Sequence, residues 1–164
     1  DAWIIKNIKG GGYRAFHRLG DVIWLDHLRD LEFPEKKFLS GGIIAQARKD
    51  KWDNVKIGIS TPPIETDYGW LLIYHGVSNP GFIYKLGAML LDYNDPKNII
   101  GRTDEPIFEP EKPYELSGIV PNVVFPCGAV LIKEKIYIYY GGADTVVGVA
   151  TMPLNNLINL LLKK

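Results

Sequence analysis

The chain has 164 residues, 46% of them hydrophobic, and its 19 basic and 19 acidic side chains cancel at neutral pH. This length fits one domain, and without net charge there is no long-range field to attract nucleic acid or an anionic membrane. A single cysteine excludes an internal disulfide, no apolar run approaches the ~20 residues of a membrane span, and the N-terminal segment lacks a signal-peptide pattern, so we expect a cytoplasmic protein.

Segments that favour β-strands follow one another along the chain and dominate it. Each is rich in β-branched and aromatic residues and is bounded by turn residues. The predicted strands are 13–18, 21–25, 55–64, 70–77, 84–91, 123–132, 135–141 and 145–152. Only residues 155–164 show a pattern that suits a short helix, and residues 33–52 and 92–121 are expected to be irregular connections. The sequence therefore predicts an all-β fold.

A recurring unit organises these strands: an aromatic strand that ends in His or Tyr, a short loop, and a second strand that closes on a turn with Asp or Asn. His17, His75 and Tyr140 mark three copies at a spacing of about 60 residues, which is typical of β-propeller blades. A β-sandwich is the alternative, although the long connections suit it less well. Because three blades cannot close a ring, their exposed faces and edges favour aggregation or self-association as a homo-oligomer.

Five polar residues are candidates for chemistry, and each has a structural alternative. Arg18, at a strand end, suits a phosphate or carboxylate, or else a surface salt bridge. Lys56 lies inside an otherwise apolar strand, and it is either a ligand contact or a solvated residue on a strand edge. Glu65 follows two prolines that fix the backbone, and either accepts from a sugar hydroxyl or caps a turn. His75 is a phosphate donor, an acid/base group or a neutral core histidine, and Asp144 is a ligand carboxylate or a turn cap.

Other kinds of site have no support in the sequence. The three histidines lack metal-ligand spacing, and there is neither a nucleophile elbow nor a phosphate-binding P-loop. Cys127 is expected to be a small buried hydrophobe, and Gly10 to Gly12 a hairpin turn. We expect no metal and no cofactor.

Four segments, read together and in order, resemble the mannoside phosphorylases of glycoside hydrolase family 130. They are KIGISTPPIETDYGWLLIYHGV (56–77), YKLGAMLLDYNDPKNIIGRTDEPIFEPEKPYE (84–115), GIVPNVVFPCGAVL (118–131) and YYGGADTVVGVAT (139–151). The family resembled is a five-bladed β-propeller whose members mostly split β-mannosides with inorganic phosphate and inversion, giving α-mannose 1-phosphate. The resemblance implies that residues 1–164 are the C-terminal part of a single propeller catalytic domain, with about three blades present and the N-terminal blades absent.

The resemblance also assigns roles to individual residues. Arg18, Lys56 and His75 match positions that bind phosphate or line its site. Asp144 matches a carboxylate that holds the mannosyl unit. We also expect Lys56, Glu65 and Tyr74 to contact the sugar. The family's general acid lies in the N-terminal blades, so it is expected upstream of Asp1 and no catalytic residue is assigned in this chain. Ser60 departs from the Gly or Pro that the family usually has there, which is expected to alter the loop near Lys56.

Three functions follow as hypotheses. The first is inverting phosphorolysis of mannosyl-glucose or manno-oligosaccharides, with inorganic phosphate as co-substrate and the isolated chain inactive. The second is a β-mannoside hydrolase of the same family, although a water nucleophile does not need the cluster of Arg18, Lys56 and His75. The third is a propeller fragment that only binds glycans.

Overall fold

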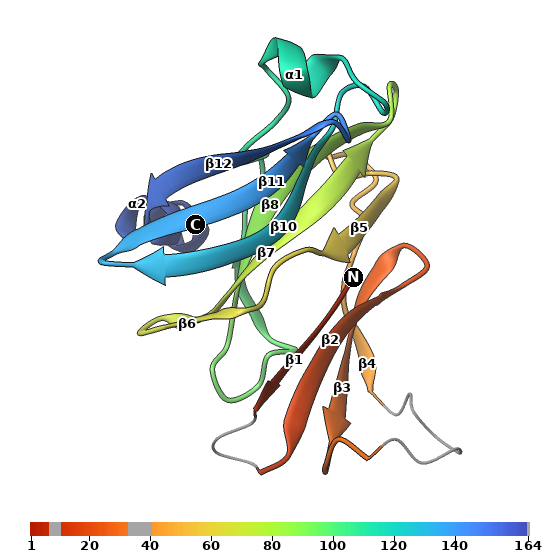
Figure 1. The fold of residues 1–164 in the computed structure, drawn as a ribbon. Helices are drawn as coiled ribbons and strands as arrows, with labels where there is room; N and C mark the ends of the chain where they lie inside the picture. Colours follow the sequence, from red (N-terminus) through yellow and green to blue (C-terminus); the bar gives the residue numbers. More distant parts are fainter. Residues whose placement is uncertain (7–10, 33–40, 164) are drawn as a thin grey trace.

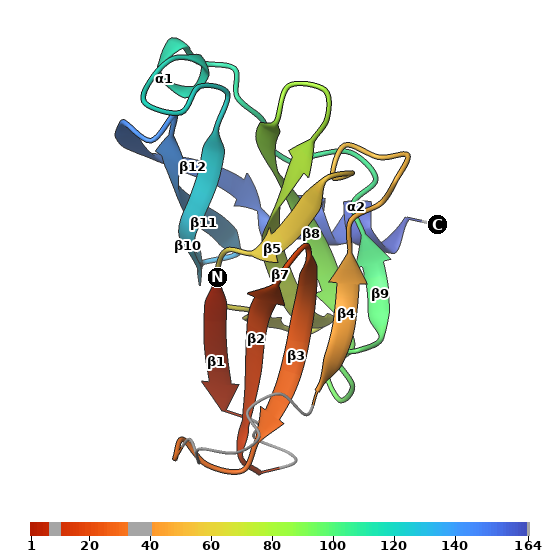
Figure 2. The same cartoon turned by 90° about the vertical axis from the view of Figure 1, so that its right-hand side faces the viewer.

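The computed structural model describes residues 1–6, 11–32 and 41–163, and its strands form three antiparallel sheets (Figure 1). The first sheet has the order β1-β2-β3-β4, with its strands side by side in Figure 2. Its strands are β1 (Ala2–Lys6), β2 (Tyr13–Leu19), β3 (Val22–Leu28) and β4 (Gly42–Gln46). Each strand pairs with the next along the chain, so this sheet is a simple meander.

The second sheet is built around one long strand, β7 (Gly69–Ser78). On one side β7 pairs with both β5 (Lys56–Ile59) and β6 (Ile64–Thr66), and on the other side it pairs with β8 (Ile83–Leu91). The strand β9 (Ile99–Arg102) completes the order β5-β7-β8-β9. The strand β5 is an edge strand of this sheet, and only its first residue, Lys56, is partly exposed.

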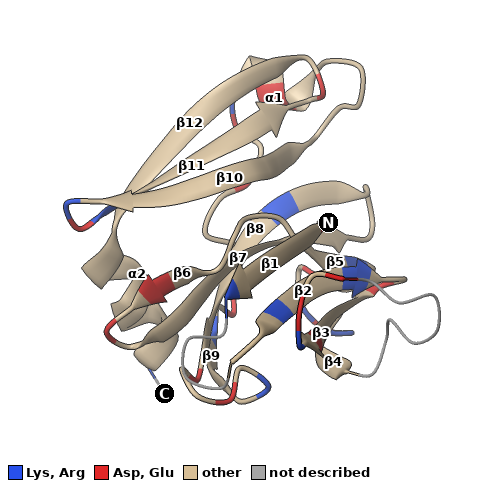
Figure 3. Cartoon of the chain, turned by 60° about the horizontal axis from the view of Figure 1, so that its bottom comes forward, with Lys and Arg blue, Asp and Glu red and all other residues tan. Residues whose placement is uncertain are grey.

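The third sheet has the order β10-β11-β12 and is followed directly by a helix. Its strands are β10 (Val124–Ile132), β11 (Lys135–Gly142) and β12 (Val146–Pro153), and the helices are α1 (Pro113–Leu116) and α2 (Leu154–Leu162). Most of the charge of this sheet lies in its turns, as the largely tan ribbons of Figure 3 show. No helix in the described part of the chain has the length and apolar content that a membrane crossing requires.

The second sheet lies between two hydrophobic cores because β7 is apolar on both faces. Trp70, Leu72 and Tyr74 belong to a core shared with the first sheet. Leu71 and Ile73 alternate with them and belong to a second core, shared with the third sheet and α2. Successive side chains of a strand point to opposite faces, so a continuous apolar run is expected where both faces are buried. The middle sheet therefore fixes both of its neighbours.

The repeat predicted from the sequence corresponds to one hairpin of each sheet. The three copies fall on β2–β3, β7–β8 and β11–β12, and the short terminal helix is present as α2. The all-β class is confirmed, whereas the number of blades in a complete propeller stays a prediction. Gly11 and Gly12 both have φ of 70° in the connection before β2, while Gly10 lies outside the described residues.

Several local predictions were wrong, for identifiable reasons. Residues 33–52 and 92–121 are not wholly irregular, because they contain β4, β9 and α1. The predicted strand 55–64 is interrupted between β5 and β6, where Pro62 and Pro63 supply no backbone N–H for a ladder. Cys127 is exposed rather than buried, since it lies where the register shifts between Pro126 and Gly128. Short segments and bulges carry too little pattern to be read from sequence.

Candidate functional site

Three polar side chains converge on a glycine where the first and second sheets meet. Gly58 pairs with His75 across β5 and β7. A Cβ at Gly58 would lie 2.5 Å from His75 Cε1, 2.7 Å from Arg18 Cδ and 2.7 Å from Asp1 Oδ2. All three side chains therefore approach the backbone of Gly58. Any other residue there would place a Cβ in the space that these side chains occupy.

Arg18 reaches this patch from the end of β2, held by two of its nitrogens. Its Nε donates to the carboxylate of Asp1 at 2.6 Å, and its Nη1 donates to the carbonyl of Gly20 at 2.7 Å. The side chain is 36% exposed. The salt bridge that was the alternative reading of Arg18 is therefore present, but it occupies only one edge of the guanidinium fork.

Lys56 begins β5 and lies over an aromatic ring instead of a carboxylate. Its Nζ is 5.2 Å from the centroid of the Tyr84 ring, a cation–π arrangement. Within the described residues it forms no ion pair. Lys56 is thus a half-buried cation on an edge strand.

His75 is almost fully buried, with only 2% of its surface exposed. Its ring packs against Phe125 and Tyr84, at centroid distances of 4.8 and 6.0 Å. Burial, followed by the positive charges of Arg18 and Lys56, lowers the pKa of His75 to about 3. The imidazole is therefore neutral near pH 7, and it can exchange hydrogen bonds without adding charge.

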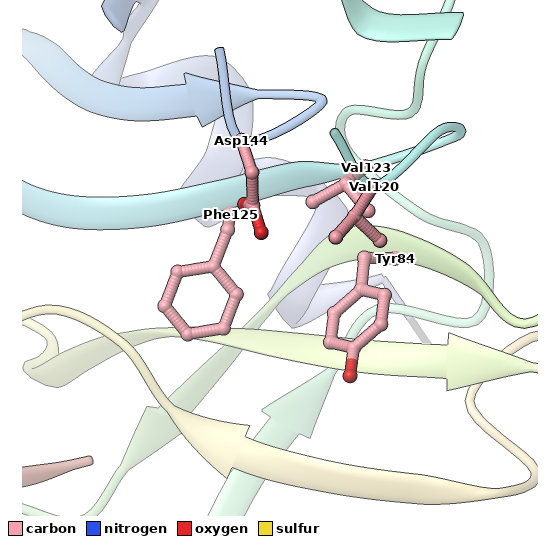
Figure 4. Close-up of a pocket in the computed structure, with 5 residues that line it drawn as sticks. All are labelled: Tyr84, Val120, Val123, Phe125 and Asp144. Atoms are coloured by element: carbon pink, nitrogen blue, oxygen red, sulfur yellow. The ribbon is translucent and has the colours of Figure 1, made fainter. Parts of the chain in front are cut away.

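Asp144 is one of the residues that line a pocket between the second and third sheets (Figure 4). Ala143 and Asp144 both have left-handed backbone angles, with φ of 45° and 52°, so the tight turn between β11 and β12 presents the carboxylate. The pocket has a volume of about 340 Å³ and is lined by Tyr84, Val120, Val123, Phe125 and Asp144. Tyr84 and Phe125 also contact His75, so the pocket and the cationic cluster share a wall.

Tyr74 and Glu65, two predicted sugar contacts, are not brought to this cluster. Tyr74 points to the opposite face of β7 from His75, where its buried hydroxyl donates to Asp53 at 2.8 Å. Glu65 pairs with Trp70, five residues or about 17 Å along β7 from His75. Its carboxylate accepts a hydrogen bond from the hydroxyl of Tyr93. The strand alternation and the register therefore separate both residues from the others.

The structure also adds residues that the sequence did not assign to the site. Asp1 reaches the cluster from just before β1, Tyr84 from β8 and Phe125 from β10, and no local motif could have indicated their proximity. Ser60, marked only as a departure from the resemblance, places its hydroxyl 2.7 Å from Nδ1 of His75. In residues 1–6, 11–32 and 41–163 no group of His, Cys, Asp and Glu side chains is arranged to hold a metal ion.

The site combines cationic and neutral hydrogen-bond donors with a pocket that has aromatic walls and a carboxylate. On an all-β scaffold, these groups define a class of protein suited to binding a small anion next to a polyol. The chain belongs to glycoside hydrolase family 130, because the family model described as beta-1,4-mannooligosaccharide phosphorylase matches residues 2–163. This confirms the family that the four sequence segments indicated.

Characterised relatives are similar over nearly the whole chain. It is 45% identical to beta-1,2-mannobiose phosphorylase of Thermoanaerobacter sp. (strain X514), covering 93% of this chain and 49% of that protein. It is 41% identical to 1,2-beta-oligomannan phosphorylase of the same organism, and the match covers 96% of this chain and 51% of that protein. The chain also matches the solved structure of beta-1,2-mannobiose phosphorylase from Listeria innocua in complex with beta-1,2-mannobiose. The TM-score is 0.88 and the identity 34%, and the match covers 98% of this chain and 46% of that one. The chain therefore spans about half the length of these relatives.

Proposed function

We propose that the protein containing this chain is an inverting β-mannoside phosphorylase that converts β-linked mannosides and inorganic phosphate to α-mannose 1-phosphate. The single observation that carries the proposal is the convergence of Arg18, Lys56 and His75 beside the pocket of Asp144. The names of its relatives support the same reaction.

The proposed reaction makes one bond and breaks one bond at the anomeric carbon. An oxygen of phosphate attacks C1 of the mannosyl unit from the face opposite the departing sugar, while the bond from C1 to the glycosidic oxygen breaks. The departing oxygen takes a proton from a general acid, and the configuration at C1 inverts. Phosphate replaces the base-activated water of a hydrolase, so only one catalytic carboxylic acid is needed. We assign that acid to no residue of this chain.

The described residues are suited to hold the nucleophile. Arg18 and Lys56 offset the charge of phosphate. The neutral imidazole of His75 adds a hydrogen-bond donor without having to take up a proton. Fixing the phosphate in this way lowers the barrier by orienting the attacking oxygen before reaction. Asp144 accepts from hydroxyls of the mannosyl ring, and the pocket walls Tyr84 and Phe125 pack against its apolar face. Tyr74 and Glu65 have no part in this assignment.

The linkage that we propose is β-1,2. Relatives named for β-1,2-mannobiose or 1,2-β-oligomannan cover at least 93% of this chain at 35–45% identity. The relative named for β-1,4-mannooligosaccharides covers 66% of it. A β-1,2-linked mannobiose is therefore the first substrate to test.

Product analysis of the complete protein tests the reaction. With β-1,2-mannobiose and inorganic phosphate we expect α-mannose 1-phosphate in ³¹P spectra, formed faster than from β-1,4-mannobiose or mannosyl-glucose. Release of free mannose at a rate independent of phosphate would instead establish a hydrolase. The name of a structure with 28% identity and a TM-score of 0.79 says that the family contains glycoside hydrolases that target beta-1,2 mannosidic linkages. Saturable mannose binding without turnover would leave only glycan binding.

A substitution of Lys56 tests the assignment of the site. Lys56→Gln removes a cation that has no acidic partner among the described residues, so the KM for phosphate should rise about tenfold while the KM for the mannoside changes little. The matched control is Lys135→Gln, since Lys135 also lies over a tyrosine, at 5.7 Å from the Tyr137 centroid, but far from the cluster along the chain. Equal effects of Lys56→Gln on both KM values would contradict the phosphate role.

A further inference from the structure

Ser60 is a nearly buried residue whose hydroxyl faces the imidazole of His75. It lies just after β5 and before Thr61 and the two prolines, and it is 7% exposed. Its Oγ is 2.7 Å from Nδ1 of His75, a short and buried hydrogen bond. The reaction assigned above uses His75 but leaves the purpose of this contact open.

The surroundings of His75 determine which ring nitrogen carries the proton. A neutral imidazole has one N–H donor and one acceptor nitrogen. Nε2 lies 3.8 Å from Oδ2 of Asp1, and a carboxylate only accepts. The proton is therefore favoured on Nε2, which leaves Nδ1 as the acceptor and the Ser60 hydroxyl as the donor. Neighbouring Arg18 and Lys56 disfavour a second proton on the ring.

The ring is also held in orientation by packing. Phe125 stands 4.8 Å from the His75 ring centroid and Tyr84 stands 6.0 Å from it, on strands of two different sheets. A turned ring would lose the Ser60 contact and would place Nδ1 elsewhere in a buried environment. An unpaired buried polar atom is costly, so the hydroxyl and the aromatic walls favour the same ring orientation.

We propose that Ser60 is a positioning residue that holds His75 as its Nε2–H tautomer, so that this N–H faces the phosphate site beside Arg18. This inference rests on the proposed function, since it names what orients one of the phosphate donors. The opposite tautomer would turn a lone pair toward an anion, which repels it. Ser60 thus acts on phosphate only through His75.

The tautomer can be measured directly in the complete protein labelled with ¹⁵N-histidine. The chain has three histidines, so His17→Gln and His27→Gln variants assign the His75 signals. We expect a protonated Nε2 and an unprotonated, hydrogen-bonded Nδ1, and the Nε2–H signal should shift as inorganic phosphate is added. In Ser60→Ala the Asp1 carboxylate remains but Nδ1 loses its donor, so we expect a fraction of the Nδ1–H tautomer to appear beside the Nε2–H form.

Kinetics of the same variants supply the second readout. Ser60→Ala should raise the KM for phosphate about tenfold, with the KM for β-1,2-mannobiose within about twofold of the wild type, because one donor to an anion is weakened. Ser60→Thr retains a hydroxyl and should restore both the tautomer and the KM. The matched control is Ser78→Ala, which removes a serine hydroxyl from β7 that lies 3.5 Å from the carbonyl of Ile83.

Two results would overturn the role of Ser60. One is a His75 tautomer that is the same in Ser60→Ala as in the wild type, even if phosphate binds more weakly, because the effect would then be structural. The other is an Nδ1–H tautomer in the wild type. Absence of phosphorolysis in the wild type would overturn the proposed function instead, and the spectra with inorganic phosphate would still decide the assignment of Ser60.

Discussion

Two adjacent residues of β7, Tyr74 and His75, face regions of the molecule that differ in how far their charged side chains are paired. On the Tyr74 face, the fully buried carboxylate of Asp53 accepts from the Tyr74 hydroxyl at 2.8 Å, from Arg48 Nε at 3.0 Å and from Arg102. Burial raises the pKa of Tyr74 well above its usual value, so its hydroxyl remains a donor. The charges of Asp53, Arg48 and Arg102 are therefore paired with one another.

On the His75 face, positive charge is only partly neutralised. Arg18 has Asp1 as its partner and is 36% exposed, whereas Lys56 forms no ion pair within the described chain. An open pocket lies alongside. A buried charge whose partners are all present contributes to the stability of the fold. A charge that is not neutralised and lies beside a pocket is available to bind a ligand.

The largest expected effect comes from breaking the network on the Tyr74 face. Asp53→Asn leaves Arg48 and Arg102 without their buried counter-charge and weakens the acceptor of Tyr74, which should lower the free energy of unfolding by about 3–5 kcal/mol. Urea unfolding of the complete protein measures it. The control is Asp104→Asn, because Asp104 is 74% exposed although it also pairs with Arg48. Similar stability of both variants would show that the network is not structural.

A smaller effect, confined to activity, is expected on the His75 face. In Gly58→Ala the new Cβ would overlap His75 and Arg18, which must move apart, so phosphorolysis should fall about 100-fold through misplaced phosphate ligands. Circular dichroism should show an unchanged fold. The matched control is Gly128→Ala, since nothing lies within 4 Å of a Cβ there. If the two variants were equally active, the convergence at Gly58 would have no functional role.

The smallest effect per step, about 1.4 kcal/mol for one pH unit, concerns the dependence of stability on pH. His75 has a folded pKa of about 3 and an ordinary value of 6.5 in the unfolded chain, so between these values the unfolded state binds more protons. Stability should fall as the pH drops below 6.5, by up to about 1.4 kcal/mol per pH unit from this residue. His75→Gln should flatten that part of the profile, and His27→Gln, which replaces an exposed histidine, should not. Identical profiles would mean that His75 is not buried in the neutral form.

Much of the fold could be predicted because strands leave a local signal. The β-branched and aromatic runs and their turns identified the hairpins β2–β3, β7–β8 and β11–β12, and the recurrence of the unit indicated three sheets. The short strands β1, β4 and β9 were missed, and β6 was not separated from β5 in the predicted strand 55–64. Their pairing depends on neighbours far along the chain, which a short pattern does not encode.

By itself the sequence determined the all-β class, the repeated hairpins and, through its motifs, the family and the residue types suited to phosphate. Only the tertiary structure decided which candidates share one site. It joined Arg18 and His75 at Gly58, placed Lys56 of the same strand over Tyr84, and placed Asp144 in the adjoining pocket. It separated Tyr74 and Glu65 from them and paired Ser60 with His75. The physical reason is that strand alternation and register, which packing between sheets selects, determine the face and the position of each side chain.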